Sequence, residues 1–151
     1  MGLQLTLGMI LIVLTVFVHA VVLDRLMVFI RLYRPQVRSI FHYRGKEFLL
    51  ACTVLGIFGT HVLEIWVWAI AYLFMNETQS LEAALYFSTT TFTTVGYGDI
   101  VLSEQWRLFS SVESANGFLL FGWSTAFIFE VMRIVWEPIP HTSSAPNTTP
   151  S

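Results

Sequence analysis

Charged residues are scarce in this sequence, and their scarcity excludes most soluble proteins. Only 12% of the 151 residues are Asp, Glu, Lys or Arg, whereas 55% are hydrophobic. An ordinary soluble domain carries about 25% charged residues. The formal net charge of −2 also excludes the basic surface that a nucleic-acid-binding protein needs. The composition therefore predicts an integral membrane protein that lies in the lipid bilayer and binds no nucleic acid.

Cysteine and catalytic motifs are nearly absent as well. Cys52 is the only cysteine, so an intrachain disulfide is excluded. The sequence contains no metal-ligand spacing, no nucleophile elbow and no phosphate-binding loop, and its polar residues are scattered along the chain. We therefore expect no enzyme activity and no cofactor.

Long uncharged stretches are what the sequence has instead. Residues 1–23 contain no charged side chain, and about 20 apolar residues suffice to cross about 30 Å of hydrocarbon. A signal peptide is the alternative for this segment, but a basic start and a clear cleavage site are missing. Residues 48–75 and 104–136 contain two further apolar runs, each interrupted by a few polar residues. The pattern predicts an all-α membrane protein with three transmembrane helices.

The few charges are unevenly distributed. Residues 24–47 hold six of the eight basic residues, and residues 76–106 hold four acidic residues and no basic one. The positive-inside rule places the first of these segments at the cytoplasmic side of a plasma or inner membrane, with the N-terminus outside and the C-terminus in the cytoplasm. Pro35 should block helix continuation, and the basic segment is either a helix end on the lipid surface or a solvated loop. Residues 137–151 are rich in Pro, Ser and Thr and should be disordered.

A further apolar stretch, residues 81–92, is too short to span the membrane. Twelve helical residues reach about 18 Å, so this segment must enter the bilayer and return on the same side. Ser80 is a suitable N-cap for a helix that starts at residue 81. The return path includes Gly96 and Gly98, which accept the positive φ that β-branched residues disfavour. Alternating backbone conformations then direct successive carbonyls to one side, where they need a cation against them.

Residues 94–99 read Thr-Val-Gly-Tyr-Gly-Asp and resemble the selectivity filter of potassium channels. The resemblance covers the two-helix potassium channel pore module, residues 48–136. Its parts would be an outer helix 48–75, a re-entrant pore helix 81–92, an extended filter 93–99 and an inner helix 104–136. Residues 1–23 form an additional helix to which the sequence assigns no role.

The resemblance implies how the filter works. Backbone carbonyls of four residues would replace the hydration shell of potassium ions, the permeant ligand: Thr94, Val95, Gly96 and Tyr97. Gly98 completes the filter. Because one chain supplies one strand of the filter, the resemblance implies a homotetramer with a four-fold axis.

The resemblance also implies which residues support the filter. Asp99 would lie at the outer mouth and bond to the pore-helix residue Tyr86. Thr93 would support the start of the filter, and Glu113 would brace the pore helix through its threonines. Tyr97 would point away from the axis as a spacer against pore-helix aromatics, with Tyr86 and Phe87 as candidates.

The inner helix contains two candidates for a gating hinge, Gly117 and Gly122. The alternative is that these small residues only allow close helix packing. Ionisable residues inside spans are functional candidates by default. For Glu64, a buried packing role competes with a gating role, while Glu130 is better interpreted as an interfacial residue paired with Arg133.

Two histidines also lie in predicted spans, His19 and His61. Both side chains could titrate near neutral pH, but a lone histidine in a span is more often a structural hydrogen-bond donor than a sensor.

The sequence therefore predicts a potassium-selective channel. The arginine spacing is irregular and follows only one extra helix, so voltage gating is not expected. A less selective cation channel and a subunit that needs a partner are the alternatives within this architecture. A non-conducting membrane scaffold would leave the carbonyl-rich segment unexplained.

Overall fold

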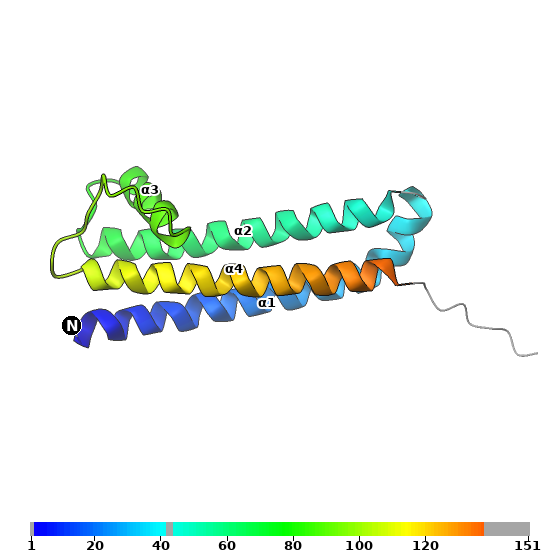
Figure 1. Ribbon diagram of the computed structural model, residues 1–151, viewed down its shortest axis with the longest axis horizontal. Coiled ribbons are helices and arrows are strands. Elements are labelled where there is room, and N and C mark those ends of the chain that lie inside the picture. The colour runs from blue at the N-terminus through cyan, green and yellow to red at the C-terminus, as the bar shows by residue number, and fades with distance from the viewer. Residues whose placement is uncertain (1, 42–43, 138–151) are drawn as a thin grey trace, which may run out of the picture.

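The computed structural model describes residues 2–41 and 44–137, and all regular structure in these residues is helical (Figure 1). The helices are α1 (Gly2–Phe41), α2 (Gly45–Phe74), α3 (Leu81–Phe92) and α4 (Arg107–Trp136). The three long helices lie side by side, and the short α3 lies at the end of the bundle where α1 begins. The tail predicted to be disordered lies outside the described residues, except for Glu137.

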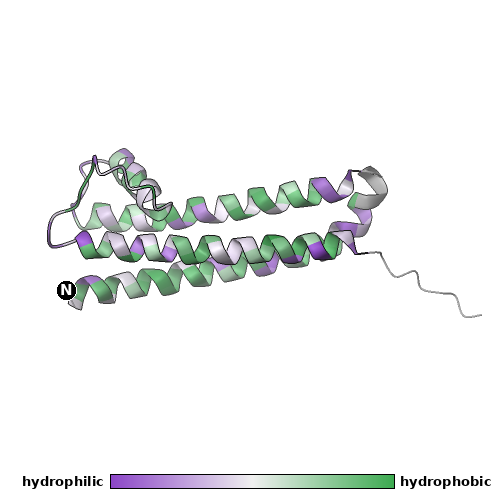
Figure 2. Ribbon diagram, viewed as in Figure 1, coloured by the Kyte–Doolittle hydropathy of each residue, from purple (hydrophilic) through white to green (hydrophobic). Residues whose placement is uncertain are grey.

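The prediction of three transmembrane helices is confirmed. Residues Gly2–Val37, α2 and α4 are each long and apolar enough to cross a membrane. Figure 2 shows apolar residues along the whole length of these helices and hydrophilic residues gathered mostly near their ends. Phe58 and Phe129 on the outward faces are 67% and 73% exposed in the single chain. Such faces fit lipid or a neighbouring chain rather than water, so the protein is an all-α, multi-pass membrane protein.

The expected end of the first helix is wrong. α1 does not stop before the basic segment but continues through Pro35 to Phe41. Packing explains this continuation, because Ile30 is buried and Val37 packs with it against Leu49 at the start of α2 and Val135 at the end of α4. These contacts offset the helix bond that proline removes.

α1 packs closely on both helices of the predicted pore module. A Cβ atom on Gly8 would lie 2.9 Å from Val112 of α4, and one on Gly56 of α2 would lie 2.8 Å from Leu26. The small residues therefore let the helices approach each other closely. α1 is thus an integral part of the bundle.

The segment between α2 and α4 is fastened at its base. Ser103 binds the Glu77 carboxylate through both its backbone N–H and its hydroxyl, each at 2.8 Å. The Trp106 N–H donates to the Ser103 carbonyl at 2.9 Å, which closes a turn before α4. α4 consequently begins at Arg107, later than the expected residue 104.

Candidate functional site

The backbone of the predicted filter alternates in conformation. Thr94, Gly96 and Gly98 have φ values of 61°, 50° and 77°, whereas Val95 and Tyr97 between them do not have positive φ. The sequence identified the two glycines but not Thr94, a β-branched residue for which positive φ is strained. The only signal for Thr94 is its spacing of two from Gly96.

The N–H groups at the start of the filter bond back to α3. The N–H groups of Val95 and Gly96 both donate to the Thr90 carbonyl, at 2.9 and 3.0 Å, and the Thr94 N–H donates to Thr91 at 2.9 Å. Among the described residues, no hydrogen bond is accepted by four successive carbonyls, those of Thr94, Val95, Gly96 and Tyr97. At membrane depth such carbonyls need a positive partner.

α3 is placed to favour a cation below the filter. Ser80 caps its N-terminus by accepting the Ala83 N–H at 3.1 Å, and its last residue is Phe92. Thr93 follows as the C-cap, and its hydroxyl donates to the Thr89 carbonyl at 2.7 Å. The partially negative C-terminus of α3 therefore lies at the start of the filter.

The C-terminal end of the filter carries the expected hydrogen bond between Tyr86 and Asp99. The Tyr86 hydroxyl donates to Asp99 Oδ2 at 2.7 Å, and Asp99 Oδ1 accepts the Ile100 N–H at 3.1 Å. The hydrogen bond from Tyr86 lowers the pKa of Asp99 below its usual value. Asp99 therefore remains charged to lower pH than a free aspartate.

Removing the Tyr86 hydroxyl should change the titration of Asp99. In Tyr86→Phe the carboxylate loses the donor that favours its charged form, so we expect the pKa of Asp99 to rise. Asp99 would then be protonated at a higher pH as the solution is acidified. A carbon-13 NMR titration of the Asp99 carboxyl measures this shift, with Tyr33→Phe on the exposed face of α1 as the control. Identical titration curves for all three proteins would contradict the role of Tyr86.

Glu113 braces α3, but not through the threonines that the sequence indicated. Its carboxylate accepts hydrogen bonds from Tyr72 of α2 at 2.5 Å and from Ser88 of α3 at 2.6 Å. All three side chains are buried. The threonine segment is held separately, because the Ser114 hydroxyl donates to the Thr91 carbonyl at 3.0 Å. Glu113 thus joins α2, α3 and α4 behind the filter.

Loss of the Glu113 carboxylate should weaken this joint. Glu113→Ala leaves the buried Tyr72 hydroxyl without an acceptor, which costs about 1–3 kcal/mol. We expect thermal unfolding in detergent to occur at a lower temperature, with a smaller change for Glu113→Gln, whose amide oxygen still accepts one bond. Glu82→Ala, at an exposed carboxylate, is the control. Equal stability of the Ala variant and the control would argue against the joint.

Gly117 lies where α4 touches the end of α3. A Cβ atom at Gly117 would lie 2.1 Å from the Phe92 carbonyl oxygen, whereas one at Gly122 meets nothing within 4 Å. The geometry therefore supports the close-packing interpretation for Gly117. The role of either glycine as a gating hinge remains a prediction.

Tyr97 does not make its expected spacer contact within one chain. Its side chain is 72% exposed, and among the described residues no ring contact joins it to Tyr86 or Phe87. The reason is that, in a single chain, no other described residue covers the face of the filter on which the Tyr97 side chain lies.

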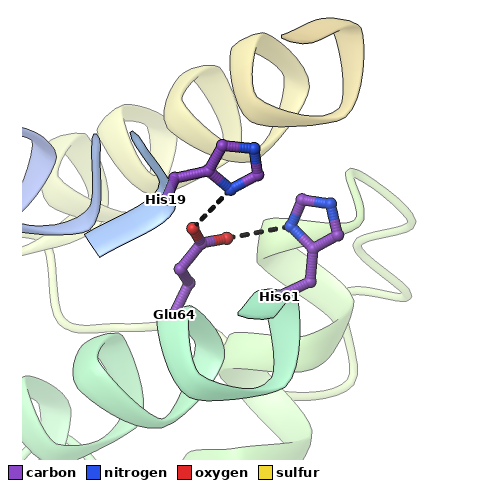
Figure 3. A group of neighbouring side chains, drawn as sticks. All are labelled: His19, His61 and Glu64. Carbon is purple, nitrogen blue, oxygen red and sulfur yellow. Dashed lines mark hydrogen bonds and ion pairs between the residues drawn. The ribbon is translucent and has the colours of Figure 1, made fainter. Parts of the chain in front are cut away.

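The sequence named three buried residues separately, His19, His61 and Glu64, but did not predict that they meet. His19 of α1 and His61 of α2 both contact the carboxylate of Glu64, each through Nδ1 at 2.8 Å (Figure 3). The spacing of His61 and Glu64, three residues apart on one helix, places them on the same face and was an available signal. No local signal links them to His19. By contrast, the expected pairing of Glu130 with Arg133 is present, at 2.7 Å.

Comparisons with known proteins agree with this geometry. Residues 60–134 match a family model described as "Ion channel". A stretch of 57 residues is 46% identical to the voltage-gated potassium channel Kch of Escherichia coli (strain K12), and it covers 37% of this chain but only 14% of that relative. No solved structure matches the chain. The match to the ion channel family over residues 60–134 indicates a channel rather than an enzyme.

Proposed function

We propose that this protein is a potassium-selective channel formed by four copies of the chain. The observation that carries the proposal is the run of four carbonyls, from Thr94 to Tyr97, that accept no hydrogen bond among the described residues. Rings of such carbonyls replace the water shell of a potassium ion. The hydroxyl of Thr94 would add a further oxygen at the inner end of the filter. No cofactor is needed.

The exposure of the filter in a single chain supports the proposed tetramer. Val95 and Tyr97 are 54% and 72% exposed in the single chain, although they belong to a segment that must be enclosed at membrane depth. One strand of carbonyls cannot surround an ion. Four copies around an axis would enclose the ion and cover both side chains.

The charges near the filter favour cations. The segment that carries the filter, residues 76–106, has four acidic residues and no basic one. In the proposed orientation, with the N-terminus outside and the C-terminus in the cytoplasm, these acids raise the cation concentration at the outer mouth. Salt screens this effect over about 10 Å, so it aids entry without choosing between potassium and sodium. The irregular arginines of α1 give no voltage sensor.

Ion flux from liposomes tests the proposal. The purified protein, verified as a tetramer by native mass spectrometry, is reconstituted, and potassium and sodium efflux are compared with and without barium. We expect potassium efflux that barium blocks and little sodium efflux. Equal efflux of the two ions would favour the less selective channel. Flux that requires an added membrane extract would indicate a partner subunit, and no flux at all would favour the scaffold.

A further inference from the structure

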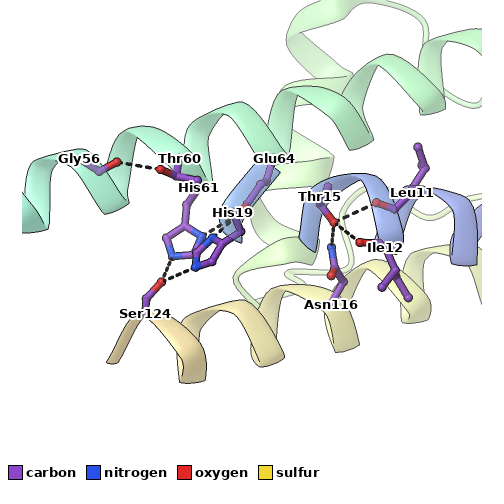
Figure 4. A network of polar contacts seen from close by, with 10 residues as sticks. All are labelled: Leu11, Ile12, Thr15, His19, Gly56, Thr60, His61, Glu64, Asn116 and Ser124. Atoms are coloured by element: carbon purple, nitrogen blue, oxygen red, sulfur yellow. Dashed lines mark hydrogen bonds and ion pairs between the residues drawn. The ribbon is translucent and has the colours of Figure 1, made fainter. Parts of the chain in front are cut away.

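A ring of hydrogen bonds joins the additional helix to both helices of the pore module (Figure 4). Its members, named here the His–Glu cluster, are His19 of α1, His61 and Glu64 of α2, and Ser124 of α4. The carboxylate contacts both histidines through Nδ1 at 2.8 Å. The Ser124 hydroxyl contacts the Nε2 atoms of His61 at 3.0 Å and of His19 at 3.3 Å. All four side chains are buried, so a missing partner leaves a buried polar atom unsatisfied.

Counting hydrogens fixes the charge of the His–Glu cluster. The ring has four contacts, and each needs one hydrogen. A neutral imidazole carries one N–H, a serine hydroxyl carries one O–H and a carboxylate carries none, so two neutral histidines and Ser124 supply only three. The fourth contact requires one additional proton. The count is the same whether that proton resides on a histidine or on Glu64.

The additional proton also removes the net charge. An ionised Glu64 with two neutral histidines is a buried anion, which is costly in an apolar environment. With one more proton the His–Glu cluster is neutral overall. A divalent cation in its place would instead leave a net positive charge, and every nitrogen and oxygen of the cluster already has a partner.

No other ionisable group of the described residues contacts the cluster. Aromatic rings surround it. Between ring centroids, Trp123 lies 5.3 Å from His19, and Phe121 and Phe92 lie 4.5 Å and 5.9 Å from His61. The next acidic residues on the packed helices are either exposed or paired elsewhere, namely Asp24 on α1, Glu47 on α2, Glu82 on α3, and Glu113 and Glu130 on α4. The proton therefore has only Glu64 as its counter-charge.

We propose that the His–Glu cluster binds one proton and that this proton fastens α1 to α2 and α4. When the proton leaves, a negative charge stays buried and one of the four contacts loses its hydrogen. The attachment of α1 therefore weakens as the pH rises. This inference gives the additional helix a role, goes beyond the proposed function and is tested without ion flux.

Glu64→Gln provides a matched variant that needs no additional proton. The glutamine amide has nearly the shape of the carboxylate but donates one N–H to the ring. Two neutral histidines, Ser124 and this amide together supply all four hydrogens. The variant should keep the ring and lose its dependence on pH. Ser124→Ala removes two contacts and should also abolish the need for the proton, so it serves as a second test if Glu64→Gln does not fold.

The measurement is thermal unfolding of the purified proteins from about pH 6 to about pH 10, with hydrogen exchange of α1 recorded at each pH. We expect the wild type to lose stability relative to Glu64→Gln as the pH rises. Its folding equilibrium constant should fall by about tenfold per pH unit while the folded protein holds the additional proton and the unfolded chain does not, and should level off once the folded protein releases it. The rate of hydrogen exchange in α1 should increase as the wild type loses stability. Glu82→Gln, which removes an exposed carboxylate on α3, should keep the pH dependence of the wild type.

Three results would overturn the inference. The first is a wild type whose stability and α1 exchange do not change over this range beyond the intrinsic exchange rate. The second is a parallel pH profile in the wild type and Glu64→Gln. The third is one equivalent of a divalent metal in the purified wild type that is missing from Glu64→Gln, because a metal would then occupy the place of the proton.

Discussion

Gly117→Ala is expected to separate the inner helix from the helix that supports the filter. The added methyl group would lie 2.1 Å from the carbonyl oxygen and 2.9 Å from the carbonyl carbon of Phe92. Both are backbone atoms, so no rotamer change relieves the clash, and α4 or the end of α3 must move. Overpacking of this kind costs about 1–3 kcal/mol or more. Because Phe92 directly precedes the filter, the displacement should reach the carbonyls that follow it.

The expected measurements for Gly117→Ala are a fall of roughly 5–10 °C in the unfolding temperature and loss of most potassium flux. Gly122→Ala is the matched control, since it adds the same methyl group to the same helix where nothing lies within 4 Å. Alanine is favoured over glycine in a helix, so the control should be as stable as the wild type. If both variants have the same unfolding temperature and the same potassium flux, the contact between Gly117 and Phe92 determines neither stability nor conduction.

Gly98→Ala should abolish selective conduction while leaving the fold nearly intact. Gly98 has φ +77°, and no atom lies within 4 Å of the position that its Cβ would occupy. The penalty is therefore conformational rather than steric, about 1–2 kcal/mol for an L-residue in the left-handed region. The filter can avoid this penalty by rotating the peptide unit, which turns a carbonyl away from the ion path. We expect potassium flux to be lost or to become equal to sodium flux.

The contrast with Gly117→Ala makes this prediction specific. Gly98→Ala should stay tetrameric with an almost unchanged unfolding temperature, because it affects a segment with few packing contacts. Gly59→Ala on α2, where nothing lies within 4 Å and φ is helical, is the control. Retention of potassium over sodium in Gly98→Ala would show that the alternating backbone does not determine the choice of ion.

Much of the pore module could be predicted because its signals are local. Residues 81–92 lie between a capping serine and a glycine-containing segment, and α3 occupies this range. The bond between Tyr86 and Asp99 joins residues only 13 apart in the chain. The spans follow from apolar length alone.

The remainder depends on contacts between distant parts of the chain. His19 and Glu64 are 45 residues apart, and His19 and Ser124 are 105 apart, so nothing in their local sequence links them. The continuation of α1 through Pro35 likewise depends on the burial of Ile30 against α2 and α4. The brace at Glu113 reaches Tyr72 and Ser88 instead of the threonines, because only the packed helices decide which hydroxyl faces the carboxylate.

The hydrogen bonds between Glu77 and Ser103 close the segment that connects α2 to α4. Two hydrogen bonds of 2.8 Å hold together residues that are 26 positions apart, so much of the entropy of closing this excursion is lost at its base rather than within the filter. α3 and the filter therefore belong to one segment whose two ends, Glu77 and Ser103, are held together. Tilting of the adjoining ends of α2 and α4 would then move this segment as a unit without stretching it.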